Sequence, residues 1–300
     1  MNILVTGSSG LIGSALVRFL TAHGHAVTRL VRGTPRASEP EFHWDPTSGR
    51  IDSRALDGVD AVVHLAGENI AAGRWTADRK TQIRESRVKG TRLLAETLAW
   101  LASPPRVLVC ASAMGYYGNR GNEVLGEDSP PGTGFLAELC QAWEAASEPA
   151  ERAGIRVVKL RVGIVLSSQG GALARMLLPF RLGLGGRIGG GRQYMSWIAL
   201  DDLVAVVLHA LTTNSLAGPV NAVTPNPVTN QEFTRMLGRV LGRPTILPVP
   251  AFAARLALGE MANELLLSSA RLEPARLLAS GYTFRYPELE GALRQVLGRK

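Results

Sequence analysis

The chain has 300 residues, of which 46% are hydrophobic, so it can bury a large core in one domain or in one domain and a small lobe. Its composition excludes a disordered, collagen-like or repeat protein. The formal net charge of +8 raises the question of a nucleic-acid partner, but the arginines are scattered without a run of five basic residues, which favours a solvated basic surface.

Short apolar runs alternate with amphipathic stretches through the first half of the chain. In chain order the sequence predicts a strand at Asn2–Thr6, a helix at Leu11–His23, a strand at Ala26–Val31, a poorly patterned segment at Thr34–Leu56, a strand at Ala61–Leu65, a helix at Asp78–Leu101, a strand at Arg106–Cys110, a helix at Phe135–Ala153 and a strand at Arg156–Leu160. Such alternation is typical of βαβ units, which build a parallel sheet with helices on both faces. The sequence therefore predicts an α/β fold with a doubly wound parallel sheet.

The second half of the chain is less regular. It predicts a helix at Ala172–Leu182, a glycine-rich stretch at 183–191, a helix over Leu203–Leu211 with Asp201 and Asp202 as N-cap and first-turn residues, and a short strand at Pro219–Val223. From Thr245 onward the chain turns to Pro- and Leu-rich helical pieces. This change predicts a small, mostly helical lobe from residues 168–192 and 242–300, and a main domain from residues 1–167 and 193–241.

Signals for targeting, disulfides and metals are absent from the sequence. The start, Met1–Gly7, has neither a basic segment nor a long apolar stretch, and no apolar run reaches the about 18 residues of a membrane span. A cytoplasmic protein without a membrane partner is therefore expected. The two cysteines, Cys110 and Cys140, make no disulfide framework, and the five histidines show no metal-ligand clustering, so no metal site is expected.

A glycine-rich segment, Thr6-Gly7-Ser8-Ser9-Gly10-Leu11-Ile12-Gly13, joins the first predicted strand to the first predicted helix. In a dinucleotide fingerprint one glycine allows a sharp turn, one lets the backbone approach a pyrophosphate, and one lets helix pack on strand. The helix N-terminus then presents free N–H groups and its positive dipole end to the phosphates. A glycine triplet alone is a weak signal, but its strand–turn–helix context favours a ligand over an empty turn. The expected cofactor contacts are Gly7, Ser9, Gly10, Leu11, Ile12 and Gly13.

The end of the second predicted strand indicates which dinucleotide binds. An NAD site usually places Asp or Glu there for the ribose 2′-hydroxyl, but this strand ends Arg29-Leu30-Val31-Arg32-Gly33 without an acid. The planar guanidinium of Arg32 suits the oxygens of a 2′-phosphate, whereas the alternative is an ordinary surface arginine. The sequence thus favours NADP(H) over NAD(H).

The third predicted strand ends in small residues, Val62-Val63-His64-Leu65-Ala66-Gly67, which would bring the backbone close to the adenine–ribose side of the cofactor. His64 is expected to pack within the strand rather than to bind a ligand, because its neighbours are apolar.

Several segments together resemble the extended short-chain dehydrogenases. They are the glycine turn, the strand end Val63–Gly67, the segment Ala111–Gly118 (ASAMGYYG) and the segment Tyr194–Leu203 (YMSWIALDDL). Further segments narrow the resemblance to atypical bacterial "epimerase family proteins" with a C-terminal domain of unknown function: Gly67–Ile70 with Arg74-Trp75, Leu178–Gly186, and Gly281–Leu289. The resemblance covers nearly the whole chain and implies a Rossmann-type fold with a nicotinamide cofactor.

This resemblance implies further cofactor contacts. Leu65 and Ala66 would line the adenosine half, Arg87 would lie on the long helix that flanks the cofactor, and Arg161 matches a nucleotide-binding arginine of the group. For both arginines the alternative is a salt bridge at a helix or strand end. Homodimers are common among such proteins, so a homodimer is also an open expectation.

The catalytic pair of the superfamily is missing from this chain. Its tyrosine acts as acid and base, and a lysine four residues later lowers the pKa of the phenol from near 10 toward neutral pH. Judged by the following Trp143-Glu144, Phe135 stands in place of that tyrosine and Leu139 in place of that lysine. No Tyr-x-x-x-Lys occurs anywhere in the sequence.

Three residues near the carboxyl end of a central strand remain as catalytic candidates. The hypothesis is that Ser112 orients the substrate and that Tyr116 or Tyr117 supplies the proton; the alternative for the tyrosines is packing with a hydrogen-bonded hydroxyl. The sequence then supports an NADP-dependent oxidoreductase or epimerase/dehydratase-like protein that acts on a small carbonyl or sugar-nucleotide-like substrate between the sheet and the lobe. The alternative is a non-catalytic NADP(H)-binding sensor or interaction protein; a nucleic-acid-binding module is the weakest interpretation.

Overall fold

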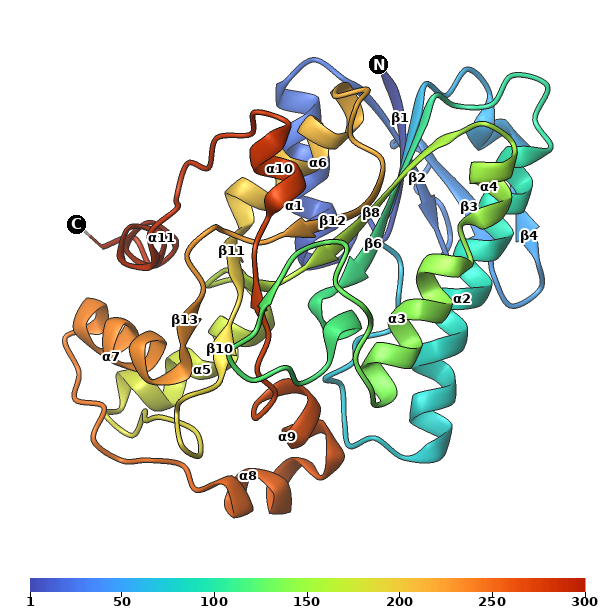
Figure 1. Ribbon diagram of the computed structural model, residues 1–300. Coiled ribbons are helices and arrows are strands. Elements are labelled where there is room, and N and C mark those ends of the chain that lie inside the picture. Colours follow the sequence, from blue (N-terminus) through green and yellow to red (C-terminus); the bar gives the residue numbers. More distant parts are fainter. Residues whose placement is uncertain (300) are drawn as a thin grey trace. The chain divides into compact units, whose positions relative to one another are not determined.

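The computed structural model describes residues 1–299 (Figure 1). Its strands are β1 (Asn2–Thr6), β2 (Ala26–Val31), β3 (Glu41–Asp45), β4 (Arg50–Ile51), β5 (Ala61–His64), β6 (Val107–Ala113), β7 (Val124–Leu125), β8 (Arg156–Val162), β9 (Ile164–Leu166), β10 (Tyr194–Met195), β11 (Trp197–Ala199), β12 (Gly218–Ala222), β13 (Val228–Thr229) and β14 (Arg271–Leu272). Its α-helices are α1 (Leu11–Ala22), α2 (Ala77–Ala99), α3 (Phe135–Ala145), α4 (Glu148–Arg152), α5 (Gly171–Arg181), α6 (Leu200–Thr212), α7 (Asn230–Leu241), α8 (Ala251–Leu258), α9 (Glu260–Leu265), α10 (Ala275–Ala279) and α11 (Leu289–Val296). Two short 3₁₀ helices are η1 (Ser53–Leu56) and η2 (Met114–Tyr117).

The main sheet has eight strands in the order β12-β8-β6-β5-β1-β2-β3-β4. Strand β1 pairs in parallel with β2 on one side and with β5 on the other, so Leu4 lies opposite both Thr28 and Val62. The β5–β6 and β2–β3 pairs are also parallel, and the short β4 runs antiparallel to its neighbour β3. The chain adds β2, β3 and β4 on one side of β1 and then β5, β6, β8 and β12 on the other side. This reversal at β1 confirms the predicted doubly wound α/β sheet.

The chain folds into two compact units. The first contains residues 1–112, 141–160 and 204–219, and the second contains residues 113–140, 161–203 and 220–300, of which 220–299 are described. Besides the lobe predicted at residues 168–192 and 242–300, the second unit contains residues 113–140, 161–167, 193–203 and 220–241.

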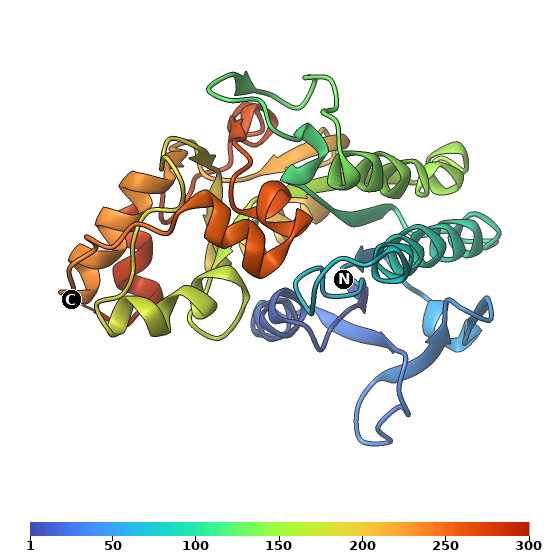
Figure 2. The ribbon, with the colours of Figure 1, turned by 90° about the horizontal axis from the view of Figure 1, so that it is seen from below.

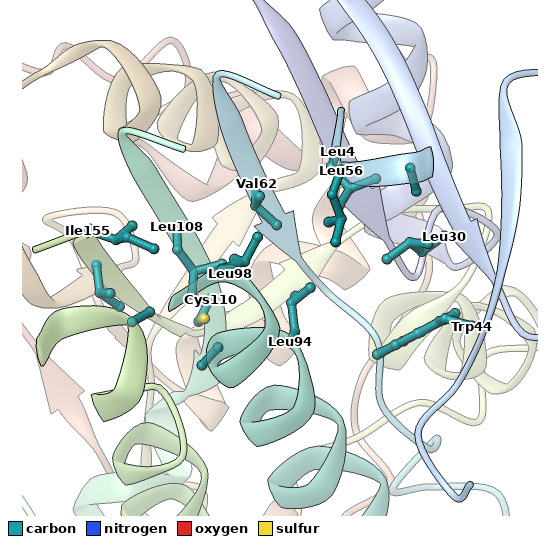
Figure 3. Close-up of a cluster of buried hydrophobic side chains, with 14 residues drawn as sticks. Leu4, Leu30, Trp44, Leu56, Val62, Leu94, Leu98, Leu108, Cys110 and Ile155 are labelled. Carbon is teal, nitrogen blue, oxygen red and sulfur yellow. The ribbon is translucent and has the colours of Figure 1, made fainter. Parts of the chain in front are cut away.

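The first unit buries an apolar cluster between its strands and the inner face of α2 (Figure 3). Successive strand residues point to opposite faces of a sheet, so Leu4 and Val62 face α2, where Leu94 and Leu98 meet them. Figures 1 and 2 show α1 and α2 on opposite faces of strands β1 and β2. The carboxyl ends of β1, β2 and β5 are thereby held at one edge, from which the glycine turn emerges.

The second unit has apolar clusters of its own. One packs α5, α7 and α11 around Trp197 and Phe233, and a smaller one surrounds the buried ring of Tyr117. The side chain of Asp202, predicted to begin a helix as a cap or first-turn residue, is 1% exposed and accepts hydrogen bonds from the backbone N–H groups of Arg285 (2.8 Å) and Tyr286 (2.9 Å). Asp202 therefore lies in the first turn of α6, but its carboxylate holds the C-terminal segment in place, because the N–H groups of that segment are its hydrogen-bond donors.

Two expected elements differ from the structure. The poorly patterned segment at 34–56 contains β3, β4 and η1. The helix expected over Phe135–Ala153 is divided into α3 and α4, because Pro149 in the first turn of α4 has no N–H to continue the hydrogen-bond ladder. Within residues 1–299, no helix is long and apolar enough to cross a membrane.

Candidate functional site

The turn between β1 and α1 brings three segments of backbone unusually close together. Gly7 has a φ of +69°, and a Cβ added there would lie 2.7 Å from the backbone N of Ala66. A Cβ added at Gly13 would lie 2.1 Å from the carbonyl O of Gly7. Both distances are too short for any side chain, so these glycines are required by the close approach of β1, α1 and the chain after β5.

Gly10 has no such requirement from the protein. Its φ of −76° and ψ of 173° suit any residue, and an added Cβ would lie 3.4 Å from the Gly7 carbonyl O, an ordinary contact. Gly10 is exposed and precedes α1, which has neither a side-chain cap nor an acidic residue in its first turn. The free N–H groups of such a helix start bind anions, so the bare Gly10 backbone leaves room for a phosphate.

The remaining residues predicted for this turn lie around the same helix start. Ser9 is exposed, and Leu11 and Ile12, the first two residues of α1, are half-buried. Their backbone N–H groups belong to the first turn, so their contribution to a phosphate site does not depend on their side chains.

Arg32 follows β2 directly and its side chain is 63% exposed. Its Nη1 lies 3.3 Å from Oε1 of Glu68, and Oε2 of the same carboxylate lies 3.4 Å from Arg79. Exposed ion pairs of this length contribute about 0–1 kcal/mol, so the Arg32 guanidinium can exchange Glu68 for a stronger anion. The sequence does not indicate that Glu68 pairs with Arg32 and Arg79, because these partners are 36 and 11 residues away along the chain.

A buried polar network supports the end of β5. The ring nitrogens of His64 bond to the hydroxyls of Thr6 (2.7 Å) and Thr91 (3.0 Å), and Trp143 Nε1 donates to Thr91 Oγ1 (2.9 Å). Burial lowers the pKa of the His64 imidazole to about 4, so the ring is neutral at pH 7. His64 is therefore a packed strand residue, as expected, and it ties β1, β5 and α2 together beneath Leu65.

Arg87 on α2 reaches the segment after β5. Its guanidinium lies 5.0 Å from the Trp143 ring centre, and Nη1 donates to the carbonyl O of Ile83 (3.2 Å). A Cβ added at Gly67 would lie 3.2 Å from Cζ of Arg87. The small residue at position 67 thus lets the arginine lie flat against the backbone that was predicted to line the adenosine.

Ser112 near the end of β6 has a carboxylate partner that sequence reasoning missed. The Ser112 side chain is 4% exposed, and its Oγ donates to Oε1 of Glu144 on α3 at 2.7 Å. A signal was present, since Glu144 follows the buried Cys140 and Trp143 at helical spacing and so lies on the inner face of its helix.

The second unit contains the two candidate tyrosines and Arg161. The Tyr117 ring is fully buried; its hydroxyl accepts from Arg161 Nη1 (2.8 Å) and lies 2.7 Å from Asn221 Oδ1, to which it donates. Burial raises the pKa of Tyr117 to about 12. Tyr116 is half-buried, and the Arg161 guanidinium stacks 3.4 Å from its ring centre. Arg161 also donates to the carbonyl O of Glu127, so it joins three segments of this unit.

The two residues that the resemblance places at the positions of the catalytic pair have apolar side chains. Phe135 is half-buried and Leu139 is 2% exposed, both on α3. Neither can transfer a proton or supply a positive charge. Among residues 1–299, no three His, Cys, Asp or Glu side chains gather as a metal site would require.

A cavity of about 370 Å³ lies in the second unit. It is lined by the glycine-rich stretch at Gly189 and Gly190, by the guanidinium-bearing Arg192 and Arg255, and by Asn122. Two arginines and a bare glycine backbone suit an anionic, hydrogen-bonding ligand.

The doubly wound sheet, with a glycine turn at the end of its central strand, defines an α/β protein with a dinucleotide-type phosphate-binding turn. Comparison with known proteins makes this specific. The chain belongs to the NAD dependent epimerase/dehydratase family, whose model matches residues 3–222. Residues 249–296 match a domain of unknown function, DUF1731. Both matches confirm the resemblance predicted from the sequence.

Relatives of known sequence and structure cover the whole chain. An epimerase family protein of Mycobacterium leprae is 47% identical over 99% of this chain and 96% of its own length. The crystal structure of human epimerase family protein SDR39U1 (isoform 2), with NADPH, covers 100% of both chains at 37% identity and a TM-score of 0.91. A Thermus thermophilus UDP-glucose 4-epimerase with NAD has 24% identity and a TM-score of 0.76, covering 99% of this chain and 98% of its own, which shows a shared fold.

Proposed function

We propose that this chain binds NADP(H), with the pyrophosphate on the turn from Gly7 to Gly13 and the 2′-phosphate on Arg32. The observation that carries the proposal is the contrast within the turn: Gly7 and Gly13 are required by the fold, whereas Gly10 is required by nothing in the protein. The exposed Arg32 and the absence of an acid at the end of β2 support the phosphorylated cofactor. The NADPH in the human relative supports it independently. We further propose a cytoplasmic location.

Each predicted contact has a role in this proposal. Backbone N–H groups of Ser9, Leu11, Ile12 and Gly13 bind the pyrophosphate, and Leu65, Ala66 and Gly67 line the adenosine. The Gly10 N–H donates to the Gly7 carbonyl O (3.1 Å), so Gly10 contributes its bare surface, on which the pyrophosphate lies. Arg87 is proposed to complete the nucleotide site. The resemblance implies the same role for Arg161, which would require its buried guanidinium to exchange a hydrogen bond to Tyr117 or Glu127 for the nucleotide. When bound, the nicotinamide ring supplies hydride transfer; the protein's own task is to orient the substrate, to exclude water and to move the proton.

The reaction proposed is that of an epimerase/dehydratase-like protein or oxidoreductase acting on a small carbonyl or sugar-nucleotide-like substrate. Ser112 would orient the substrate oxygen, and it must exchange its hydrogen bond with Glu144 to do so. Tyr116 suits proton transfer better than Tyr117, because the Tyr117 hydroxyl is buried and its pKa is raised. The arginine-lined cavity with Arg192 and Arg255 supports an anionic substrate such as a nucleoside-diphosphate sugar.

A second candidate is an NADP(H)-binding sensor or interaction protein without catalysis. The observation in its favour is that Phe135 and the buried Leu139 stand where the resemblance places the Tyr–Lys pair. This candidate keeps the cofactor proposal and removes only the reaction.

Cofactor binding is tested by titrating NADPH and NADH against the intact protein, Arg32→Ala and Arg18→Ala. Arg18 is an exposed arginine on α1 and serves as the charge-matched control. Loss of a charge-assisted hydrogen bond costs about 1.5–3 kcal/mol, which predicts about 10- to 150-fold weaker NADPH binding for Arg32→Ala alone. Equal losses for NADPH and NADH, or no NADPH affinity in the intact protein, would refute the assignment.

Catalysis is tested by a screen of NADPH oxidation over aldehydes, ketones and nucleotide sugars. If a substrate turns over, Ser112→Ala and Tyr116→Phe should lower kcat, whereas Tyr117→Phe should act mainly through stability. Unchanged turnover in Ser112→Ala and both tyrosine variants would reject the catalytic roles. NADPH binding without turnover of any substrate would favour the sensor.

A further inference from the structure

The positive charge of this chain is concentrated in two segments that contain no acidic residue. Residues 162–200 carry arginines at positions 175, 181, 187 and 192, and residues 233–259 carry arginines at positions 235, 239, 243 and 255. These eight arginines equal the formal net charge of +8, so the other basic residues balance the acidic ones. Both segments belong to the second unit.

The two segments meet around a cavity of about 270 Å³ that is separate from the arginine-lined cavity described above. Its lining residues are Arg187, Gln231, Thr234, Arg235, Thr245, Ile246 and Pro248. Three backbone or side-chain hydrogen bonds hold its walls together: Val249 N–H to Arg187 O (2.8 Å), Gln231 N–H to Gly191 O (2.9 Å) and Ile188 N–H to Asn230 Oδ1 (2.7 Å).

Thr234 gives this cavity a polar group without a partner. The residue is 2% exposed, and its Oγ1 is buried without a hydrogen bond among the described residues. A buried hydroxyl left unsatisfied costs about 1–3 kcal/mol. A ligand atom in the cavity that accepts from the Thr234 hydroxyl would remove this cost.

The two arginines of the lining form no direct ion pair with a described carboxylate. Among residues 1–299, Arg235 has no hydrogen bond or ion pair, and Arg187 donates only to the carbonyl oxygens of Gly189 and Gly190. The nearest acid in the sequence, Glu232, closes the capping box at the start of α7 with Thr229. The Glu232 carboxylate interacts electrostatically with Arg235 but makes no direct ion pair with it. Two guanidinium groups without a direct ion pair and a buried hydroxyl without a hydrogen bond therefore line one cavity.

We propose that this cavity is a second anion site that binds the phosphoryl group of a small organic phosphate. Guanidinium groups match phosphate oxygens in pairs, the Thr234 hydroxyl and Gln231 amide supply neutral donors, and Ile246 and Pro248 offer apolar contact to the organic part. The site lies outside the glycine turn and does not depend on the cofactor proposal.

The test is calorimetric titration of the full-length protein with inorganic pyrophosphate, using malonate as a carboxylate comparison. The variant pair Arg187→Gln with Arg235→Gln should weaken pyrophosphate binding at least 10-fold, and Thr234→Val should weaken it about 3-fold or more. The control pair Arg181→Gln with Arg243→Gln removes the same charge from the same two segments but lines no part of the cavity, so it should change the affinity less than about 2-fold. Circular dichroism melting checks that all variants fold.

Several results would overturn the proposal. Equal losses in the lining and control pairs would mean diffuse charge attraction, and a loss confined to Arg192→Gln with Arg255→Gln would place the anion in the other cavity. Malonate binding as tightly as pyrophosphate would refute the phosphoryl assignment. Because pyrophosphate can also enter the glycine turn, the titration is repeated in Gly10→Ala protein, where binding at this cavity should persist whether or not the chain binds NADPH.

Discussion

Alanine at position 13 and alanine at position 10 should have opposite consequences, because one glycine serves the fold and the other serves the ligand. At Gly13 an added Cβ would lie 2.1 Å from the carbonyl O of Gly7, whereas ordinary contacts begin at 3.4 Å. The turn must therefore move by more than about 1 Å. Overpacking of this kind costs about 1–3 kcal/mol, which corresponds to a fall in Tm of roughly 2–12 °C.

The Gly10→Ala change should leave stability almost unaltered. The φ of −76° and ψ of 173° are open to alanine, and the added Cβ meets only the Gly7 carbonyl O at 3.4 Å. Alanine lowers the conformational entropy of the unfolded chain, which stabilises the folded protein by about 0.4–1 kcal/mol. Alanine is also a poorer helix N-cap than glycine, and this cost is of similar size. The Tm should stay within about 2 °C of the parent.

The affinity for NADPH, in contrast to the stability, should fall in Gly10→Ala. In the proposed site, a methyl group at position 10 stands where the pyrophosphate approaches the backbone, so at least one charge-assisted hydrogen bond should be lost. That loss is about 1.5–3 kcal/mol, or about 10- to 150-fold in Kd. Thermal melting and a fluorescence titration with NADPH measure both effects on the same preparations.

Gly126→Ala is the matched control for these variants, because a Cβ added there meets nothing within 4 Å and its φ is not positive. It should change neither Tm nor NADPH affinity. A Gly10→Ala protein that binds NADPH as tightly as the parent would refute the placement of the pyrophosphate. An unchanged Tm in Gly13→Ala would refute the steric argument for the strand–helix contact.

Three further outcomes follow from the polar groups of the first unit and its surroundings. Burial lowers the pKa of His64 to about 4, so its contribution to stability is complete above pH 6.5 and is lost as the pH falls toward 4. The free energy of unfolding measured in urea should fall by roughly 2 kcal/mol between pH 7 and pH 5, and His64→Gln should remove this fall. An equal fall in both proteins would exclude His64 as its source. Glu68→Gln should tighten NADPH binding about 2- to 5-fold without changing NADH binding, because the Glu68 carboxylate competes with the 2′-phosphate for Arg32 and an exposed ion pair is worth about 0.5–1 kcal/mol. An unchanged ratio of the NADPH and NADH affinities would contradict this. Burial raises the pKa of the Cys110 thiol to about 12, and Cys140 is buried too. Iodoacetamide at pH 8 should therefore label neither thiol until urea unfolds the chain. Rapid labelling of the native protein would show that one thiol is accessible.

The first βαβ unit could be predicted because its signals are local. The strands Asn2–Thr6 and Ala26–Val31 have the predicted bounds, and the helix between them ends one residue earlier than expected, at Ala22. The apolar alternation, the glycine turn and the stop at Gly24 all lie within a few residues of the structure they specify.

Strand β3, which lies between β2 and the short edge strand β4, could not be predicted in the same way, because its support comes from other parts of the chain. Its sequence, Glu41–Asp45, is mostly polar and buries only Trp44 fully. Arg29 on β2 pairs with Glu39 and Glu41, and these ion pairs help to hold β3 beside β2. Long-range ion pairs of this kind leave no periodic pattern in the sequence.

The candidate site shows the same division between local and long-range information. The glycine turn and Arg32 follow from sequence, whereas Glu68 and Glu144 become visible only when the fold brings them to Arg32 and Ser112. Carboxylates are common on surfaces, and their spacing along the chain does not identify these partners. A carboxylate on the buried face of an amphipathic helix, as at Glu144, is the one sequence signal that could have been used.

The loss of the Tyr–Lys pair is not compensated by Tyr117. A catalytic phenol needs a hydroxyl that can reach the substrate and a pKa brought toward neutral pH. The Tyr117 hydroxyl instead accepts from Arg161, donates to Asn221 and has its pKa raised to about 12 by burial. It is held as part of the interior of the second unit. If the chain catalyses a reaction, we propose that the proton is moved by Tyr116 or by Ser112, whose hydroxyl donates to Glu144. The turnover of variants at these two residues therefore distinguishes an enzyme from a cofactor-binding sensor.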